Sequence, residues 1–429
     1  MAKRIDWKGG LGSVLLWSVI SAAFIGPGTV TTAASAGALH GLKLIWALLF
    51  STLATILVQE GVVRLTLVSG KSFGDLIRHR FGSEKNGLIP YGVFIGLWLG
   101  CAAYEAGNLV GAAAGIRMIW AVPQWIAILL IGLAVYLLLK KGNTIFLARF
   151  LGGIVALMGL AFCWMAWHTP QPIWEWLSGS LVPSLPTGSS LLVIGLIGTT
   201  IVPYNLFLAS GVARPQAMGE MRLGIAIAVG IGGLISLAIL VVGTRLEGSF
   251  SFLTMAKALD QYMGIAGKGL FALGLFAAGF SSAITAPMAA SLAGSRLSGE
   301  KISAPAIWLS VLGLGLVFGL ADIRPIPLII SAQAFNGLLL PLMTALLYVL
   351  LNDASLMGHA WINRPGHNAL FLMVVGVTCW LGVFNILQAG LKALGKPTEF
   401  SLIQALLVSA LMVGFVGGVY RMGAKQRRG

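Results

Sequence analysis

The sequence has few charged residues, and acidic ones are especially rare. Only 10% of its 429 residues are Asp, Glu, Lys or Arg, and Asp and Glu together number 13. A soluble protein of this length would need more charge to cover its surface, since about 25% of residues are charged in an average globular protein. Because 58% of the residues are hydrophobic, we expect an all-α polytopic protein whose partner is the lipid bilayer.

Cysteine is equally scarce, which excludes two further classes. Cys101, Cys163 and Cys379 lie inside apolar runs and lack the spacing of metal ligands, so we predict neither a disulfide framework nor a resident metal. The net charge of +15 comes from basic residues in short loops and tails, where it concerns orientation in the membrane rather than nucleic acid. We expect no nucleic-acid partner and no cofactor. An enzyme is disfavoured because no paired histidines with zinc-protease spacing appear.

Twelve apolar runs are long enough to be read as spans of about 30 Å of hydrocarbon. They cover residues 11–39, 44–68, 88–120, 125–139, 145–167, 189–213, 221–242, 269–293, 304–320, 326–351, 369–391 and 400–420. The basic N-terminal segment resembles the start of a signal peptide, but the apolar run behind it is too long and no cleavage pattern follows, so we expect it to be retained.

The distribution of Lys and Arg predicts the orientation of these spans. If the N-terminus is inside, the inner segments hold more than twice as many Lys and Arg as the outer ones. Such an excess marks the cytoplasmic side. We therefore expect a multi-pass protein of the cell (inner or plasma) membrane with both termini in the cytoplasm.

Two of the spans are interrupted by proline. One interruption is Gly26-Pro27-Gly28 and the other is Val202-Pro203-Tyr204. Proline removes a backbone donor and glycine adds backbone freedom, so a helix stops at each of them. Unpaired backbone groups inside a bilayer are tolerated only where they line a cavity or meet a ligand. The two breaks therefore predict a transport site.

The spacing of the two breaks is the period of the chain. Pro27 and Pro203 lie 176 residues apart, and the same shift relates the starts of spans two to five to those of spans seven to ten within a few residues. Successive groups of five spans have opposite orientations, which predicts an inverted repeat. We expect one repeat in residues 1–168, the second in 189–352, and two peripheral helices in 369–421.

Several segments share their order and spacing with one known family. They are residues 26–29 with 36–46, 64–70, 75–82 and 202–208, then Ser281-Ser282, and Gln333 with Leu340-Pro341. They resemble the NRAMP family of divalent metal transporters. The resemblance implies a LeuT-type fold of two inverted five-helix repeats with two extra C-terminal helices, twelve transmembrane helices in all, that works by alternating access.

The chain departs from that family at the metal site. The family builds its site from Asp-Pro-Gly-Asn in the first span and Met-Pro-His-Asn in the sixth, and the Asp, the Asn and the Met bind the metal. The residues found here at the differing positions are Gly26 for Asp, Thr29 for Asn, Val202 for Met and Tyr204 for His. Apart from the prolines and Gly28, only Asn205 matches. In the third span, Asn108 stands where the proton-pathway glutamate of the family is expected, which puts proton coupling in doubt.

A site of neutral groups predicts a substrate of the opposite sign. A dication without a counter-charge is unfavourable in a medium of low dielectric constant, whereas half-helix N-termini, hydroxyls and an amide suit an anion. Our leading hypothesis is a secondary-active transporter of a small anion such as bicarbonate. The predicted substrate-binding residues are Gly26, Pro27, Gly28, Thr29, Val30, Val202, Tyr204, Asn205 and Gln333.

A possible coupling ion belongs to this hypothesis, and one other function is its alternative. Ser281 and Ser282 lie where LeuT-type proteins place sodium ligands, which suggests sodium symport, although small hydroxyl residues also pack helices together. The alternative function is an NRAMP-type transporter of a divalent metal (manganese, iron or magnesium) that binds hydrated ions through carbonyl oxygens.

Acidic residues within the spans have two possible roles. Glu105 is either a functional carboxylate or a structural partner of Arg64 or Arg117. Glu60 and Arg64 are four residues apart on one span, which predicts a local ion pair.

Overall fold

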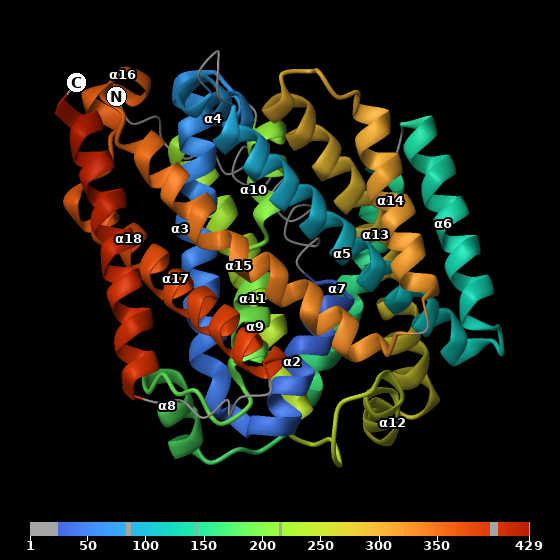
Figure 1. Ribbon diagram of the computed structural model, residues 1–429. Helices are drawn as coiled ribbons and strands as arrows, with labels where there is room; N and C mark the ends of the chain where they lie inside the picture. Colours follow the sequence, from blue (N-terminus) through green and yellow to red (C-terminus); the bar gives the residue numbers. More distant parts are fainter. Residues whose placement is uncertain are drawn as a thin grey trace.

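The protein is helical wherever its structure is described. The computed structural model describes residues 25–82, 87–142, 145–213, 217–321, 323–394 and 402–428, and within these ranges it contains helices but no strand (Figure 1). The transmembrane helices are α2 (Pro27–His40), α3 (Ile45–Ser69), α5 (Leu88–Ile119), α6 (Gln124–Lys141), α7 (Ile145–Trp167), α9 (Ser190–Thr200), α10 (Pro203–Val212), α11 (Met218–Gly243), α13 (Ile265–Ser298), α14 (Ala304–Leu320), α15 (Pro325–Leu351), α17 (Pro365–Ala393) and α18 (Leu402–Arg428).

These helices correspond to the predicted spans. Within the described ranges, ten helical tracts are long and apolar enough to cross a membrane. One of them, Pro27–Ser69, holds both α2 and α3, and a further apolar helix, Ala304–Leu320, is shorter. The first predicted span, 11–39, lies outside the described residues up to residue 24. The all-helical membrane fold expected from the sequence is confirmed.

Four further helices lie at the two ends of the bundle. α4 (Phe73–Phe81) and α16 (Ala354–Trp361) lie at one end, and α8 (Ile173–Leu181) and α12 (Phe252–Met263) at the other (Figure 1). α4 begins because the Ser72 hydroxyl accepts a hydrogen bond from the Asp75 N–H, and α12 begins with a capping box between Ser251 and Thr254.

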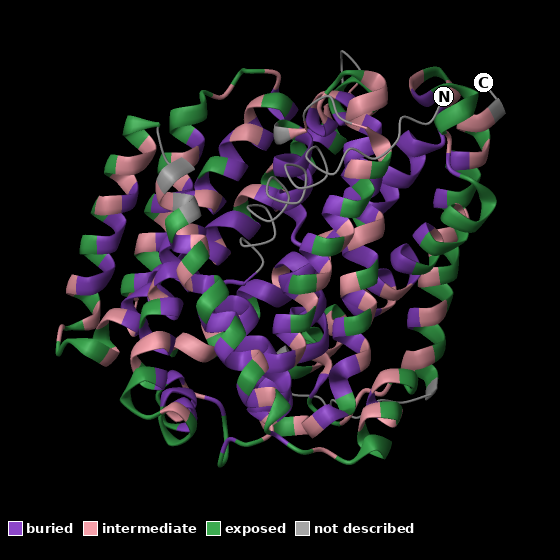
Figure 2. Ribbon diagram, turned by 180° about the vertical axis from the view of Figure 1, so that it is seen from behind, coloured by how far each residue is buried: buried purple, intermediate pink, exposed green. Residues whose placement is uncertain are grey.

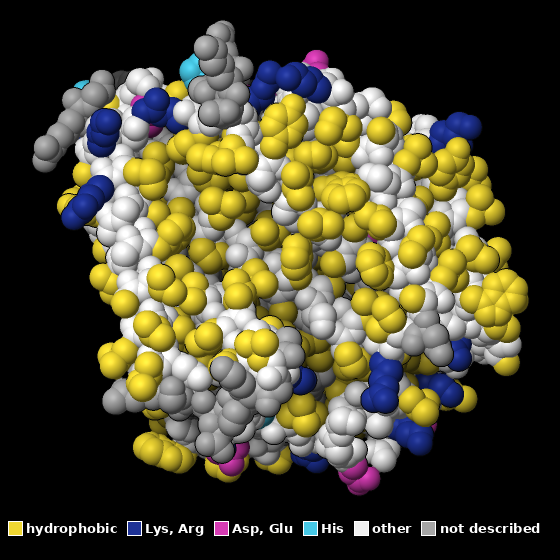
Figure 3. Space-filling model, in the orientation of Figure 1, with side chains coloured by type: hydrophobic (Ala, Val, Ile, Leu, Met, Phe, Trp, Pro, Cys, Tyr) yellow, Lys and Arg dark blue, Asp and Glu magenta, His cyan; other side chains and the backbone are white. Residues whose placement is uncertain are grey.

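The broken helix α9–α10 lies at the centre and α18 at the edge. In an apolar window of 18 residues within Ser190–Gly211, 94% of the residues are buried, against 11% in the corresponding window of Ile403–Arg427. Figure 2 shows the same contrast between buried central helices and outer helices with exposed faces. On the face drawn in Figure 3, hydrophobic side chains cover the middle and the basic ones gather toward the two ends, as expected for a protein surrounded by lipid.

Helices α5 and α13 are in close contact. A Cβ atom on Gly279 of α13 would lie 2.6 Å from the backbone nitrogen of Ala112, and one on Gly115 of α5 would lie 2.6 Å from the carbonyl oxygen of Ala272. The two backbones therefore touch because glycine occupies both contacts, the usual way in which membrane helices approach closely.

Candidate functional site

The first break is the N-terminus of α2. The helix begins at Pro27, and Gly26 before it is extended, with φ −102° and ψ 179°. The first helical hydrogen bond runs from the Val30 N–H to the Gly26 carbonyl at 3.2 Å, and no side chain caps this end. All residues from Ile25 through Gly37 are buried. The helix thus starts inside the protein rather than at its surface.

The second break separates α9 from α10. α9 ends at Thr200 and α10 begins at Pro203. Ile201 (φ −89°, ψ 77°) and Val202 (φ −79°, ψ 120°) lie outside the helical region. Pro203 has no N–H to continue the hydrogen bonds of α9, so the break follows from the sequence.

A hydrogen bond joins the two breaks directly. The hydroxyl oxygens of Thr29 and Thr199 lie 2.9 Å apart, and both residues are buried. From α5, the Tyr104 hydroxyl donates to the carbonyl of Gly198 at 2.8 Å. The Tyr104 ring meets that of Tyr204 edge to face, with centroids 5.7 Å apart. Through Tyr104, helix α5 therefore contacts both α9 before the second break and α10 after it.

Two more side chains lie against the first break. A Cβ on Gly28 would fall 1.9 Å from Nε2 of Gln333, so the amide of Gln333 lies directly on the backbone of α2. A Cβ on Gly26 would lie 3.3 Å from the Ser282 hydroxyl oxygen. Ser281 differs from its neighbour because it bonds within its own helix, donating to the Ala278 carbonyl at 3.2 Å.

Several polar atoms of these helices lack a partner among the described residues. They are Oγ1 of Thr31, Oδ1 and Nδ2 of Asn205, Oγ of Ser282 and Oε1 of Gln333. Leaving a buried polar atom without a hydrogen bond costs about 1–3 kcal/mol, so a concentration of such atoms points to a ligand or water. Four of the five are oxygens: the two amide oxygens accept hydrogen bonds or bind cations, and the two hydroxyls can also donate.

All nine substrate-binding residues predicted from the sequence are buried. The structure connects Thr29 with the second break through Thr199, and Gly28 with Gln333. Thr199 and Tyr104 were not among the predicted residues. A pattern could have suggested Thr199, because its distance before Pro203 places it in the last turn of α9, but the contact of Tyr104 depends on how α5 packs. Substrate binding by the nine residues stays a prediction.

The predicted structural partners of Glu105 are elsewhere. Arg64 pairs with Glu60 at 3.2 Å, and Arg117 donates to the amide oxygen of Gln124 at 3.0 Å. The prediction that either arginine pairs with Glu105 is therefore wrong. The physical reason is that each cation finds an oxygen nearer in the chain.

Glu105, on α5, instead packs against α14. It is fully buried, and a Cβ on Gly315 of α14 would lie 2.4 Å from its Cγ. The Asn108 amide lies beside the carboxyl group but outside hydrogen-bonding geometry. Within the described ranges there is no group of three or more His, Cys, Asp or Glu residues that could hold a metal. None of the nine predicted substrate-binding residues carries a carboxylate.

Comparison with known proteins identifies the family. Residues 18–388 match the family model Nramp, described as natural resistance-associated macrophage protein-like. The divalent metal cation transporter MntH of Verminephrobacter eiseniae is 26% identical over 281 residues, which cover 59% of this chain and 62% of that protein. MntH of Bacillus subtilis is 27% identical over 246 residues, 53% of this chain and 56% of that protein. This chain thus matches less than two thirds of the length of these relatives.

A solved structure shows the same fold over almost the whole chain. The Eremococcus coleocola manganese transporter, in complex with an aromatic bis-isothiourea substituted compound, superposes with a TM-score of 0.74 at 18% identity. The match covers 99% of this chain and 95% of that one. It confirms the LeuT-type architecture of two inverted repeats that the sequence resemblance implied.

The leading substrate hypothesis, a small anion such as bicarbonate, is wrong. The curated relatives are named divalent metal cation transporters, which supports the alternative function. The prediction of sodium symport depended on the anion and is therefore wrong as well. The error was to weigh only the missing carboxylates. The amide oxygens of Asn205 and Gln333 have no partner among the described residues, and such oxygens can bind a cation.

The family match extends over both breaks, over α5 with its contacts to the second break, and over Gln333 on α15. The sequence, the fold and the curated relatives agree on one assignment. This chain belongs to the Nramp family, a family of membrane transporters.

Proposed function

We propose that the protein transports a divalent metal cation by alternating access, and that the cation binds between the two helix breaks. The observation that carries this proposal is the buried junction of the breaks, where Thr29 meets Thr199 at 2.9 Å and oxygens of Asn205 and Gln333 lack a partner among the described residues. The names of the curated relatives support the choice of substrate.

The donors determine which metals suit the site. Amide, hydroxyl and backbone carbonyl oxygens are hard ligands, which favour magnesium or manganese over soft ions such as cadmium. Val202 and Tyr204 offer neither a thioether nor an imidazole. Because none of the nine predicted substrate-binding residues has a carboxylate, the ion keeps part of its hydration shell and binds weakly. We therefore expect a high-capacity transporter with modest affinity.

The repeats and the orientation belong to the same proposal. Residues 1–168 and 189–352 form the two inverted repeats, and residues 369–421 form the peripheral pair of helices. Both termini face the cytoplasm of a cell whose inner or plasma membrane holds the protein. A pocket of about 380 Å³ at the far end of α10, lined by Phe207, Ser210 and Arg296 among others, lies about two turns from the break and is the candidate route to that side.

Uptake into proteoliposomes tests the function. The wild-type protein should carry manganese and magnesium inward down their gradients. Asn205→Leu removes both unpartnered amide atoms while keeping the volume, and should lower the uptake at least about tenfold, the loss expected for one buried polar ligand. Ser236→Ala is the control, because its hydroxyl is buried but bonds within α11.

Two results would contradict the proposal. One is a folded wild-type protein that carries neither metal. The other is Asn205→Leu with the full uptake of the Ser236→Ala control.

A further inference from the structure

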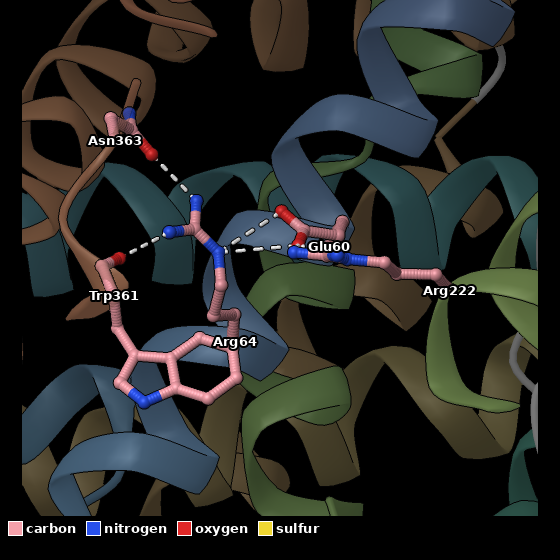
Figure 4. A network of polar contacts seen from close by, with 5 residues as sticks. All are labelled: Glu60, Arg64, Arg222, Trp361 and Asn363. Carbon is pink, nitrogen blue, oxygen red and sulfur yellow. Dashed lines mark hydrogen bonds and ion pairs between the residues drawn. The ribbon is translucent and has the colours of Figure 1, made fainter. Parts of the chain in front are cut away.

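A network of charged and polar groups joins α3, α11 and the segment from the end of α16 into the connection to α17 (Figure 4). Glu60 and Arg64 lie one turn apart on α3, and the Glu60 carboxylate is 3.2 Å from Nε of Arg64. The same carboxylate is 2.9 Å from Arg222 of α11. This confirms the local ion pair predicted from the sequence and adds a second cation to it. Two guanidinium groups thus share one carboxylate.

The remaining donors of Arg64 reach a different part of the chain. Its Nη1 donates to the carbonyl of Trp361, and its Nη2 donates to Oδ1 of Asn363, both at 2.6 Å. Trp361 ends α16 and Asn363 lies in the connection to α17. In the part of the chain that the structure describes, these are the only side-chain hydrogen bonds that join α3 to this connection. Figure 4 shows the guanidinium between the two groups of partners.

Burial makes these contacts depend on each other. Arg64 is 4% exposed and Asn363 is 3% exposed. A buried guanidinium is tolerated only while its donors are satisfied, because an unpaired buried charge is strongly destabilising. When α3 moves relative to the α16–α17 connection, Arg64 must therefore lose both neutral acceptors and find water instead.

The acceptor at Asn363 is weaker than it could be. An amide oxygen holds a guanidinium less tightly than a carboxylate does, and Nδ2 of Asn363 has no partner among the described residues. The C-terminal helix holds the same residue from the other side. Arg427 of α18 donates to the backbone carbonyl of Asn363 and, at 2.7 Å, to Oδ1 of Asn352. Asn363 thus connects α3 with the end of α18.

We propose that Arg64 and Asn363 form a releasable latch between α3 and the C-terminal helices. The latch stabilises the conformation seen here, and it opens when α3 and α11 move against α17 and α18 during transport. This gives the peripheral helices a function, since they supply the fixed side of the latch. The role in transport rests on the alternating access proposed above, whereas the latch itself can be tested without any metal.

The test measures the distance between the two sides of the latch. Spin labels are placed at Lys71→Cys, just beyond α3, and at His367→Cys, in the first turn of α17, in a background without the three native cysteines; both positions are exposed. Pulsed electron paramagnetic resonance is recorded on purified full-length protein in nanodiscs without divalent metal. The parent should show one dominant distance.

Asn363→Ala keeps the Glu60–Arg64 ion pair and removes only the side-chain acceptor. It should raise the population of a second, longer distance about tenfold or more, as expected for losing a buried hydrogen bond to a charged group. Asn363→Asp replaces the unpartnered Nδ2 with a second acceptor and should narrow the distribution around the parent distance. Glu300→Gln is the control, because it removes an exposed ion pair with Arg296 at the end of α13.

The latch is refuted if Asn363→Ala and Asn363→Asp both give the parent distribution, or if Glu300→Gln shifts it as much as Asn363→Ala does. Uptake assays on the same variants separate this proposal from the function. If the distances change as expected but the protein takes up no metal, the latch is supported and the proposed substrate is refuted. If metal uptake is normal but the Asn363 variants leave the distances unchanged, the proposed function is supported and the latch is refuted.

Discussion

Gly28 shows how a single residue shapes the site. Its missing side chain leaves the space in which the Gln333 amide lies on α2, because a Cβ there would be 1.9 Å from Nε2 and 2.5 Å from Cδ. The sequence predicted that both residues belong to the site, since one is part of a helix break and the other belongs to a family motif. It could not predict their contact, which depends on the packing of α15 against α2.

Gly28→Ala should displace the Gln333 amide. We expect the uptake of manganese to fall at least about tenfold, because an unpartnered oxygen that faces the ion is moved away. Gly313→Ala on α14 is the matched control, since no atom lies within 4 Å of the Cβ it would add. Equal uptake by the two variants would show that Gln333 takes no part in binding.

Gly26→Asp should raise the affinity for divalent metal. The extended backbone at Gly26 accepts Asp, a preferred N-cap residue, and the nearest neighbour of the new Cβ is the end of a serine side chain at 3.3 Å. A carboxylate beside a dication in a buried site is strongly attractive. The KM for manganese uptake should therefore fall severalfold. An unchanged or higher KM would place the ion away from the first break.

At the scale of helices, the sequence predicts the long elements well and misses the short ones. Hydrophobic length alone placed α7 and α14 at their observed bounds. The helices α4, α8, α12 and α16 have 8 to 12 residues and amphipathic faces. They escaped prediction because their apolar stretches are too short to span a membrane, and their positions are set by the ends of the bundle.

Gly279→Ala should destabilise the contact between α5 and α13. The added methyl group would meet the backbone of Asn108 and Ala112 at 2.6–2.7 Å, and backbone atoms cannot move aside as a flexible side chain can. We expect a loss of about 1–3 kcal/mol, read as a lower melting temperature in detergent. Gly269→Ala, on the same helix with open space around it, should leave the melting temperature unchanged or raise it. The same melting temperature in both variants would mean that α5 and α13 are not in close contact.

At the scale of the whole molecule, the fold followed from the sequence but the substrate did not. Twelve spans, two breaks and their spacing are properties of composition and order, and these survive strong divergence. The sign of the substrate depends on which backbone and side-chain atoms point at the ion. That the amide oxygens of Asn205 and Gln333 have no partner among the described residues is visible only in three dimensions.

The orientation of the molecule can be tested with two engineered cysteines. Lys392→Cys near the end of α17 and Lys425→Cys near the end of α18 lie on opposite sides in our assignment. A membrane-impermeant maleimide should label the first in intact cells, and the second only after permeabilisation, because the basic excess holds the α18 end inside. The reverse pattern would invert the whole assignment.

The most direct test of the central claim is anomalous X-ray diffraction from crystals of the protein soaked in manganese. We predict an anomalous peak between the N-termini of α2 and α10, close to Thr29, Asn205 and Gln333, that weakens in Asn205→Leu. Crystals of the wild-type protein with manganese bound elsewhere, and no peak between the two helix breaks, would contradict the account.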